Sequence, residues 1–529
     1  MEDVFVVSMG GSGSAVANSL VFLASAGVFE DRVKNIHLLI VDAHANHKGT
    51  KAAFENSIDY RFLQSKFNPN KGFSSFKPNI IPYTWDLLVN YTGTRVKRER
   101  FSLKDLTLID RNGIDLDEYD DTCILAELLM KSLYTGYEQG QAVLTGFHAH
   151  PSIGAACGTA AVLSDNGRSG YGEFVKALQS KLSLGDTRLA LVGSLFGGTG
   201  ASSLSSIVRA LHKAGNQPGL PGNLSIAGVF LLKYFAFKEP EDAISPEKKI
   251  RKEMFDFGSK NALTYYNESG LLKKNGHDET GLFDAIYMLG FDKPIERAPY
   301  RDGDEMDNPA SFVEMEAAMA IRDFFVDRTI ESGDLNRTFF KAIYEHSKDD
   351  VKFYKMEWET FTKGQELRKW LGKAVKIALI FNMYLFPIFF TKAGGMRKAA
   401  FQPYECYIEG NGDALTACER LRLFHFRFET WCLQIAETLG DDVTKSNMFD
   451  LTQFKELVNF QSNTDNKSKE NESTDLLKKY DRGNPLLYGD SKNNFIKLGS
   501  RLNTRSKKVK ENGLAELLEL VYNEAVLEV

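Results

Sequence analysis

Two glycine-rich turns, far apart in the chain, each follow a short apolar run. The first lies in VVSMGGSGSAVANSL near the N-terminus, and the second lies in LVGSLFGGTGASSLSS at 191–206. The runs 4–9 and 187–195 predict buried strands, and the small residues after each turn fit helices. A strand, a glycine turn and a helix form the first half of a βαβ unit. The pattern therefore implies a parallel sheet.

The same alternation continues through the first part of the chain and defines its domains. Further strands are predicted at 35–45, 223–235 and 282–292. We therefore predict an α/β domain at 1–330, with a doubly wound, mostly parallel sheet and helices on both faces. Within it, 48–140 is predicted as an insertion of helices and loops, and 308–327 as a central helix. The less regular segment 331–529 predicts a second domain, α+β or mainly helical. Its polar stretch 461–474 predicts a disordered loop.

Composition favours a soluble cytoplasmic protein. Of the 529 residues, 43% are apolar and 26% are charged, and the net charge of -5 gives no reason to expect a nucleic-acid partner. The five cysteines form no C-x-x-C pair, which argues against a zinc site or a disulfide framework. The longest apolar run, 377–390, contains Pro387 and is shorter than the roughly 18–20 residues that span a bilayer. We therefore predict no transmembrane segment.

Glycine turns between strands and helices suit phosphate binding. Backbone N–H groups approach the ligand closely there, and the helix N-terminus adds partial positive charge. Both turns are expected at the carboxyl edge of the sheet, where ligands of open parallel sheets bind. Tight packing of strand against helix is the simpler explanation for a single glycine turn. The occurrence of two such turns favours a nucleotide held from two sides.

Two common nucleotide motifs fit poorly. A P-loop needs a lysine after its last glycine, and neither cluster has one. A Rossmann fingerprint reads G-x-G-x-x-G/A, whereas this chain has Gly11, Gly13 and then Val16. Asp42, at the end of the second strand, does resemble the ribose-binding acid of a Rossmann domain. A dinucleotide-binding enzyme that uses Gly11, Gly13 and Asp42 therefore stays open as an alternative.

The second turn resembles the tubulin/FtsZ signature G-G-G-T-G-[ST]-G. Residues 196–202 read F-G-G-T-G-A-S, so Phe196 replaces the first glycine and Ser202 the last. Four further elements resemble that superfamily in the same order. They are GGSGSAVAN at 10–18, VDAHA at 41–45, HAHPSIGAACGTAA at 148–161 and DNPASFVEMEAAM at 307–319. The chain thus resembles a divergent prokaryotic tubulin-like protein over about 1–330.

The resemblance implies a site for GTP or GDP, with Mg2+ held mainly by phosphates and water. It assigns Gly11, Ser12 and Gly13 to the α and β phosphates and Asp42 to the vicinity of the phosphates or magnesium. Asn308 would bind the guanine, or else cap the following helix. The second turn would hold the β and γ phosphates through Gly197, Gly198, Thr199, Gly200 and Ala201. The residues that would complete the site are Gly10, Asn18, Ala149 and Gly154.

The resemblance also implies self-assembly into a homo-oligomer or filament, with GTP hydrolysis at a subunit interface. In that family an acidic loop after the central helix completes hydrolysis, but 327–340 has no clean match, and no catalytic residue is assigned. Glu314 and Glu316 are expected to be surface or packing residues. A nucleotide-binding regulatory or scaffold protein without turnover or filaments is therefore a second hypothesis. The C-terminal domain is a candidate surface for partner proteins.

Overall fold

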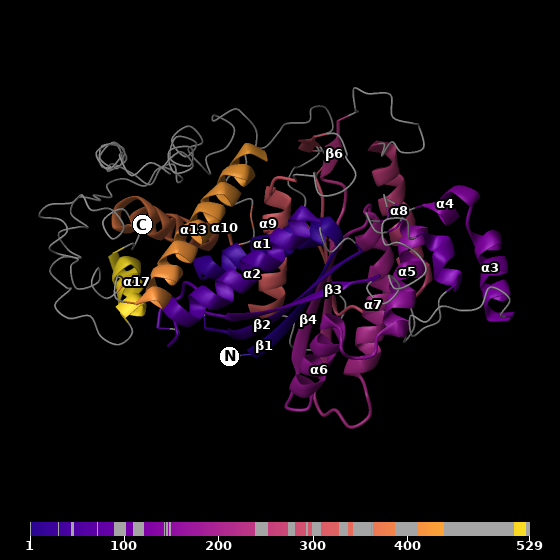
Figure 1. Ribbon diagram of the computed structural model, residues 1–529, viewed down its shortest axis with the longest axis horizontal. Coiled ribbons are helices and arrows are strands. Elements are labelled where there is room, and N and C mark those ends of the chain that lie inside the picture. The colour runs from indigo at the N-terminus through magenta and orange to yellow at the C-terminus, as the bar shows by residue number, and fades with distance from the viewer. Residues whose placement is uncertain are drawn as a thin grey trace, which may run out of the picture.

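The computed structural model describes the parts of the chain that build a central sheet and the helices around it (Figure 1). The described residues are 2–29, 31–43, 47–70, 72–88, 102–108, 121–141, 143, 147, 150–238, 252–272, 281–291, 295–298, 308–326, 337–341, 361, 363–386, 408, 411–438 and 513–524. The predicted loop 461–474 lies outside them.

The sheet confirms the predicted α/β fold with parallel strands. Its seven strands have the order β3-β2-β1-β4-β5-β7-β9, and every neighbouring pair is parallel. The strands are β1 (Glu2–Met9), β2 (Val33–Asp42), β3 (Asn79–Asp86), β4 (Thr187–Ser194), β5 (Leu224–Leu231), β7 (Ala285–Leu289) and β9 (Arg337–Lys341). A separate two-stranded parallel sheet joins β6 (Phe235–Phe237) to β8 (Ile295–Arg297).

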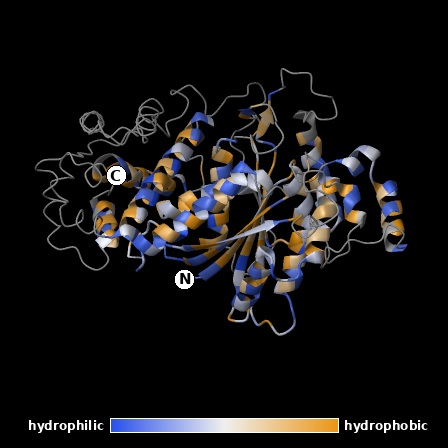
Figure 2. Ribbon diagram, viewed as in Figure 1, coloured by the Kyte–Doolittle hydropathy of each residue, from blue (hydrophilic) through white to orange (hydrophobic). Residues whose placement is uncertain are grey.

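Side chains alternate between two apolar cores, one on each face of the sheet. Along β1, Val4 and Val6 enter one core, whereas Phe5, Val7 and Met9 enter the other. Both faces are therefore covered, which is why the strands are continuous apolar runs and not alternating polar and apolar ones. Figure 2 shows this concentration of hydrophobic residues along the central strands.

The helices divide between the two faces. The first core contains residues of α1 (Gly10–Ala26), α2 (Lys48–Phe67), α9 (Phe312–Val326), α10 (Gly364–Leu379), α13 (Gly412–Thr438) and α17 (Gly513–Glu524). The second contains residues of α3 (Asp121–Leu133), α5 (Pro151–Ser164), α6 (Gly170–Leu182), α7 (Gly198–Gly215) and α8 (Lys252–Glu268). Shorter elements are η2 (Leu103–Leu108), α4 (Gly136–Gly140) and the π-helix η6 (Ile380–Leu385).

The segment 48–140 needs a correction, because it is not only an insertion of helices and loops. It contributes α2 and the edge strand β3, which pairs with β2 along its whole length. The strand NIIPYTWD contains Pro82 and is apolar only in part, so its sequence does not read as a buried parallel strand. Proline is tolerated here because β3 lies at the edge of the sheet.

Two predictions near the central helix also change. The helix begins at Phe312 and not at 308, so Asn308 is not its N-cap. Glu314 and Glu316 are fully buried packing residues. The end of the predicted acidic-loop region 327–340 belongs to strand β9, and 327–336 lie outside the described residues.

The described C-terminal helices share their core with the N-terminal part of the chain. Trp431 of α13 donates from Nε1 to the Ser19 hydroxyl of α1 at 3.1 Å, and Arg427 pairs with Asp59 of α2. The domain division at 330 stays a prediction. Within the described residues, no helix is long and apolar enough to cross a membrane.

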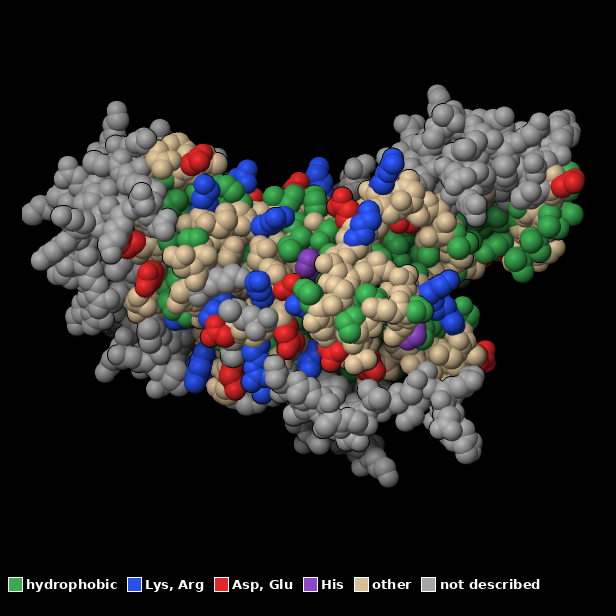
Figure 3. Space-filling view, turned by 90° about the horizontal axis from the view of Figure 1, so that it is seen from below, with side chains coloured by type: hydrophobic (Ala, Val, Ile, Leu, Met, Phe, Trp, Pro, Cys, Tyr) green, Lys and Arg blue, Asp and Glu red, His purple; other side chains and the backbone are tan. Residues whose placement is uncertain are grey.

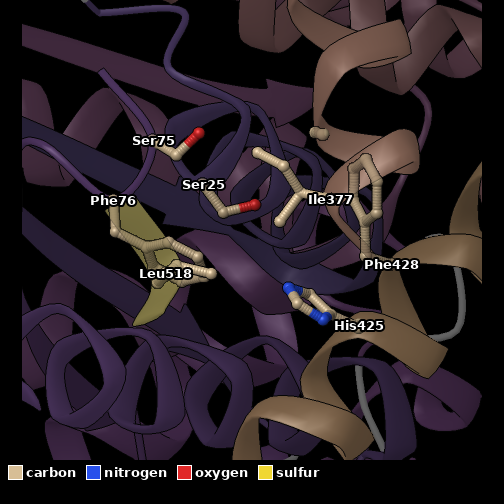
Figure 4. Close-up of a pocket in the computed structure, with 8 residues that line it drawn as sticks. Ser25, Ser75, Phe76, Ile377, His425, Phe428 and Leu518 are labelled. Atoms are coloured by element: carbon tan, nitrogen blue, oxygen red, sulfur yellow. The ribbon is translucent and has the colours of Figure 1, made fainter. Parts of the chain in front are cut away.

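A small cavity lies where these helices meet, with room for about one water molecule. Figure 4 shows residues of α1, α10, α13 and α17 around it. The lining residues are Ser25, Ser75, Phe76, Ala374, Ile377, His425, Phe428 and Leu518. Ser25 is close to the C-terminal end of α1, roughly 22 Å along the helix from Gly10 at a rise of 1.5 Å per residue. This cavity is therefore remote from the glycine turns.

We expect acid to destabilise the fold through His425. Burial lowers the pKa of this imidazole from 6.5 to about 3. The unfolded chain would protonate it below about pH 6.5, so stability is lost as the pH falls from there toward 3. At about pH 5 the loss amounts to about 2 kcal/mol.

Thermal unfolding of the wild type and of His425→Gln at about pH 7.5 and pH 5 tests this. The midpoint of the variant should fall less between the two pH values. Equal falls would show that His425 does not carry the effect.

Candidate functional site

The two glycine turns lie side by side at the carboxyl edge of the sheet. The first follows β1 and opens α1, and the second follows β4 and opens α7. Strands β1 and β4 are neighbours, and the strand order reverses direction between them. A Cβ atom placed on Gly10 would lie 3.1 Å from Cβ of Thr199, so the turns are in contact. This position is the topological switch point, where open α/β sheets bind ligands.

Each helix presents backbone N–H groups without intrahelical acceptors at this point. The first-turn amides of an α-helix have no carbonyl one turn earlier. Within the described chain we find no other acceptor for three amides of each helix. They belong to Gly10, Gly11 and Ser12 of α1 and to Gly198, Thr199 and Gly200 of α7. Together with the two helix dipoles, they create an environment that favours an anion.

Backbone conformation and close packing explain why several positions in the turns are glycine. Gly10 has φ +69°, a backbone conformation that favours glycine. A Cβ on Gly13 would come within 3.1 Å of the Val192 carbonyl oxygen, and one on Gly200 within 2.8 Å of the Ser194 backbone. Gly13 and Ala201 lie one position past the free amides. The amide of Ala201 instead donates to the Gly197 carbonyl at 3.2 Å.

Asp42 ends β2 and accepts hydrogen bonds from hydroxyl groups of α2 and α7. Its carboxylate accepts from Thr50 at 2.9 Å and from Thr199 at 3.4 Å. The Thr50 hydroxyl is also 3.1 Å from that of Ser14 in α1. The Thr199 hydroxyl is thus directed to Asp42. The sequence analysis missed Thr50, which lies in the first turn of α2 and has no motif of its own.

The third predicted loop also approaches the second turn. Pro151 begins α5, where its missing N–H costs nothing, and Ala149 lies outside the described residues. A Cβ on Gly154 would overlap the Ser202 side chain, and a Cβ on Gly198 would lie 2.7 Å from Cβ of Phe147. Gly154 therefore serves the packing of α5 against α7.

The two predicted asparagines lie in different surroundings. Asn18 accepts from Nδ2 of Asn56 at 2.7 Å, across the contact between α1 and α2. Asn308 is half-buried and precedes α9 by four residues. Asn18 therefore lies along α1 beyond the free amides, and Asn308 near the start of α9.

A buried polar network adjoins the second turn, and sequence patterns do not reveal it. The Tyr234 hydroxyl donates to Oε1 of Glu314 at 2.6 Å. Arg297 donates to the same carboxylate oxygen at 2.9 Å. Phe196, the departure from the family signature, packs against Tyr234 with ring centroids 5.9 Å apart.

The described residues contain no group of three His, Cys, Asp or Glu side chains that could hold a metal ion. The oxygen atoms around Asp42 that could act as metal ligands are those of its carboxylate and of the Thr50 and Thr199 hydroxyls. This set fits Mg2+ only as a partner of phosphates and water, because Mg2+ prefers six oxygen ligands.

We expect Gly200→Ala to destabilise the protein by about 1–3 kcal/mol, because the new methyl group would overlap the Ser194 backbone. Gly72→Ala is the matched control, since nothing lies within 4 Å of a Cβ at Gly72. It should change stability by less than about 0.5 kcal/mol. Thermal unfolding of both variants checks this, and equal midpoints would contradict the close packing of the second turn.

Comparison with known proteins found no relative of this chain. No family model matches the chain, and no curated protein or solved structure matches it. The likeness to the tubulin/FtsZ superfamily therefore stays a prediction that depends on residues 1–330 alone.

Proposed function

We propose that the two glycine turns bind the phosphates of a nucleotide, with GTP or GDP as the first candidate. The observation that carries this proposal is the contact between two helix N-termini at the switch point of the sheet. A single helix end commonly binds one phosphate group. Two ends in contact suit a polyphosphate, whose negative charges extend over several ångströms.

In this proposal the chain binds and orients the phosphates through backbone groups. The amides of Gly11 and Ser12 hold one part of the polyphosphate, and those of Gly198 and Thr199 the other. Bound Mg2+ would neutralise phosphate charge and would be held mainly by phosphates and water. Asp42, fixed by two hydroxyls, is the one carboxylate we place next to it.

The choice of guanine and the proposal of self-assembly follow the family resemblance. Helix α3 adds support for assembly, because its leucines are exposed at one end of the molecule (Figure 3). Leu125 is 61% exposed and Leu133 is 71% exposed. Apolar surface of this kind is typical of contacts with other proteins. We propose that it contacts a second copy of this chain.

Hydrolysis of GTP would need an acidic loop after the central helix. The segment 327–336, where that loop would lie, is outside the described residues, and no catalytic residue is assigned. The alternative is a regulatory or scaffold protein that binds nucleotide tightly with negligible turnover and no filaments. Light scattering and phosphate release, each followed with and without GTP over a range of protein concentration, distinguish the two.

A dinucleotide-binding enzyme is the second alternative. The strand order 3-2-1-4-5 also occurs in Rossmann domains, and Asp42 ends β2 where those domains bind ribose. A Rossmann domain holds its dinucleotide with one such glycine turn. The contact between the two turns therefore favours a bound polyphosphate over a dinucleotide.

We expect GTP, and not NAD(H), to raise the thermal midpoint. A ligand present at about 100 times its Kd stabilises by about 2.7 kcal/mol. Mass spectrometry of nucleotide released from the purified, denatured protein provides an independent identification. Stabilisation by NAD(H) with none by GTP would favour the dinucleotide enzyme, and stabilisation by neither would contradict the proposed function.

We expect Gly11→Asp to weaken GTP binding while the protein stays folded. A carboxylate in the first turn of α1 interacts favourably with the helix dipole but repels phosphate, at a cost of about 1–4 kcal/mol. Gly11→Ala controls for size, because a Cβ there makes an ordinary contact 3.4 Å from His47. Titration calorimetry measures both variants. Equal affinities in Gly11→Asp and Gly11→Ala would place the phosphates elsewhere.

A further inference from the structure

We propose that Tyr266 of α8 is a positioning residue that fixes the first turn of α7 for phosphate binding. The inference rests on the proposed function, in which the amides of Gly198 and Thr199 hold part of the phosphate. It adds that a buried side chain from another helix, which does not touch the ligand, holds these amides in place.

The first turn of α7 has little intrinsic tendency to form a helix. Residues 198–203 read G-T-G-A-S-S, and glycine, threonine and serine form helices less readily than alanine. Gly197 precedes the helix, and no side chain caps its start. The Ser202 hydroxyl donates to the Gly198 carbonyl one turn earlier, and such bonds tend to bend a helix. The orientation of the first amides therefore depends on contacts from outside α7.

Two side chains from other elements supply such contacts. Asp42 of β2 accepts from the Thr199 hydroxyl at 3.4 Å, and the Tyr266 hydroxyl donates to the Ala201 carbonyl. The Ala201 amide donates to the Gly197 carbonyl at 3.2 Å, which closes the first turn. Ala201 thus connects Tyr266 to the start of the helix. Between Gly197 and Ala201 lie the three amides that have no acceptor.

Tyr266 is itself held in place by its surroundings. Its side chain is fully buried, and its ring packs against Phe230 of β5 with centroids 5.9 Å apart. Its carbonyl accepts from the amide of Leu271 at 2.9 Å, just after α8. Burial raises the pKa of the phenol, so the hydroxyl keeps its proton and can donate. The hydrogen bond to Ala201 therefore connects the start of α7 to α8 and to the sheet.

A fixed turn matters because the ligand is held through backbone groups. Binding sites need their groups held within about 0.5 Å of the productive geometry. A hydrogen bond in an apolar core is costly to leave unmade, so it restricts the positions that Ala201 can take. Without the Tyr266 hydroxyl, we expect the first turn of α7 to open more often, which would disperse the amides that face the phosphate.

Tyr266→Phe tests the proposal, because it removes one hydroxyl and keeps the ring. Tyr60→Phe is the matched control, since Tyr60 is also fully buried and its hydroxyl donates to a backbone carbonyl, that of Pro78, at 2.8 Å. Two measurements apply to each variant: the Kd for Mg-GTP, and hydrogen exchange of the Ala201 amide. We expect Tyr266→Phe to raise the Kd about three- to tenfold and to speed this exchange. Tyr60→Phe should change neither.

The two measurements separate this inference from the proposed function. If the wild type binds no nucleotide, the proposed function fails, and exchange at Ala201 alone decides whether Tyr266 fixes the turn. An exchange rate in Tyr266→Phe equal to that of the wild type would overturn the inference, whatever the affinity of the wild type. Faster exchange with an unchanged Kd would also overturn it, because the hydroxyl would then contribute to stability and not to binding. Should Tyr266→Phe not fold, Tyr266→Met removes the same hydroxyl with a more adaptable side chain, and the same two changes are expected.

Discussion

The first-turn amides of α1 and α7 are the constraint on which the rest of the site depends, and the described residues offer them no acceptor. A helix cannot supply acceptors for its own first turn, so these groups need water, a side chain or a ligand. A parallel sheet places all such helix starts at one edge. Here α1 packs in the core on one face and α7 in the core on the other. Their turns meet only because β1 and β4 are neighbours.

Glycine allows the two turns to approach each other this closely, and side chains pack on either side of them. Gly10 adopts a positive φ next to Thr199, and Gly200 lies against the Ser194 backbone. On one side of the turns, Asp42 takes up the hydroxyls of Thr50 and Thr199. On the side of α9, the buried Tyr234 hydroxyl donates to Glu314. The Thr199 hydroxyl is thus bound within the protein, which leaves the amides of this turn as the groups for an anion.

The sequence was sufficient for the parts of the fold that depend on local pattern. Continuous apolar runs indicated the five strands between the two edges of the sheet, β1, β2, β4, β5 and β7, and glycine clusters marked the two turns. The strand β3 could not be found in this way, because Pro82 and the polar residues around it suit only an edge position. The link from Tyr234 to Glu314 joins residues 80 positions apart. No spacing rule predicts such a contact, and a buried glutamate contradicts the usual expectation for a charged residue.

Two residues of the second turn differ from the tubulin/FtsZ signature that it resembles, and both make packing contacts in this structure. Phe196 stands where the family has its first glycine, and its ring packs against Tyr234, Phe235 and Phe255. Ser202 stands where the family has its last glycine, and it faces Gly154 across the contact of α5 with α7. At that contact Gly154 leaves room for the Ser202 side chain. The Phe196 ring ties the second turn to the buried Tyr234, which donates to Glu314. Both side chains thus pack the second turn against the rest of the fold, and neither takes the place of its first-turn amides, which stay the groups that can bind an anion.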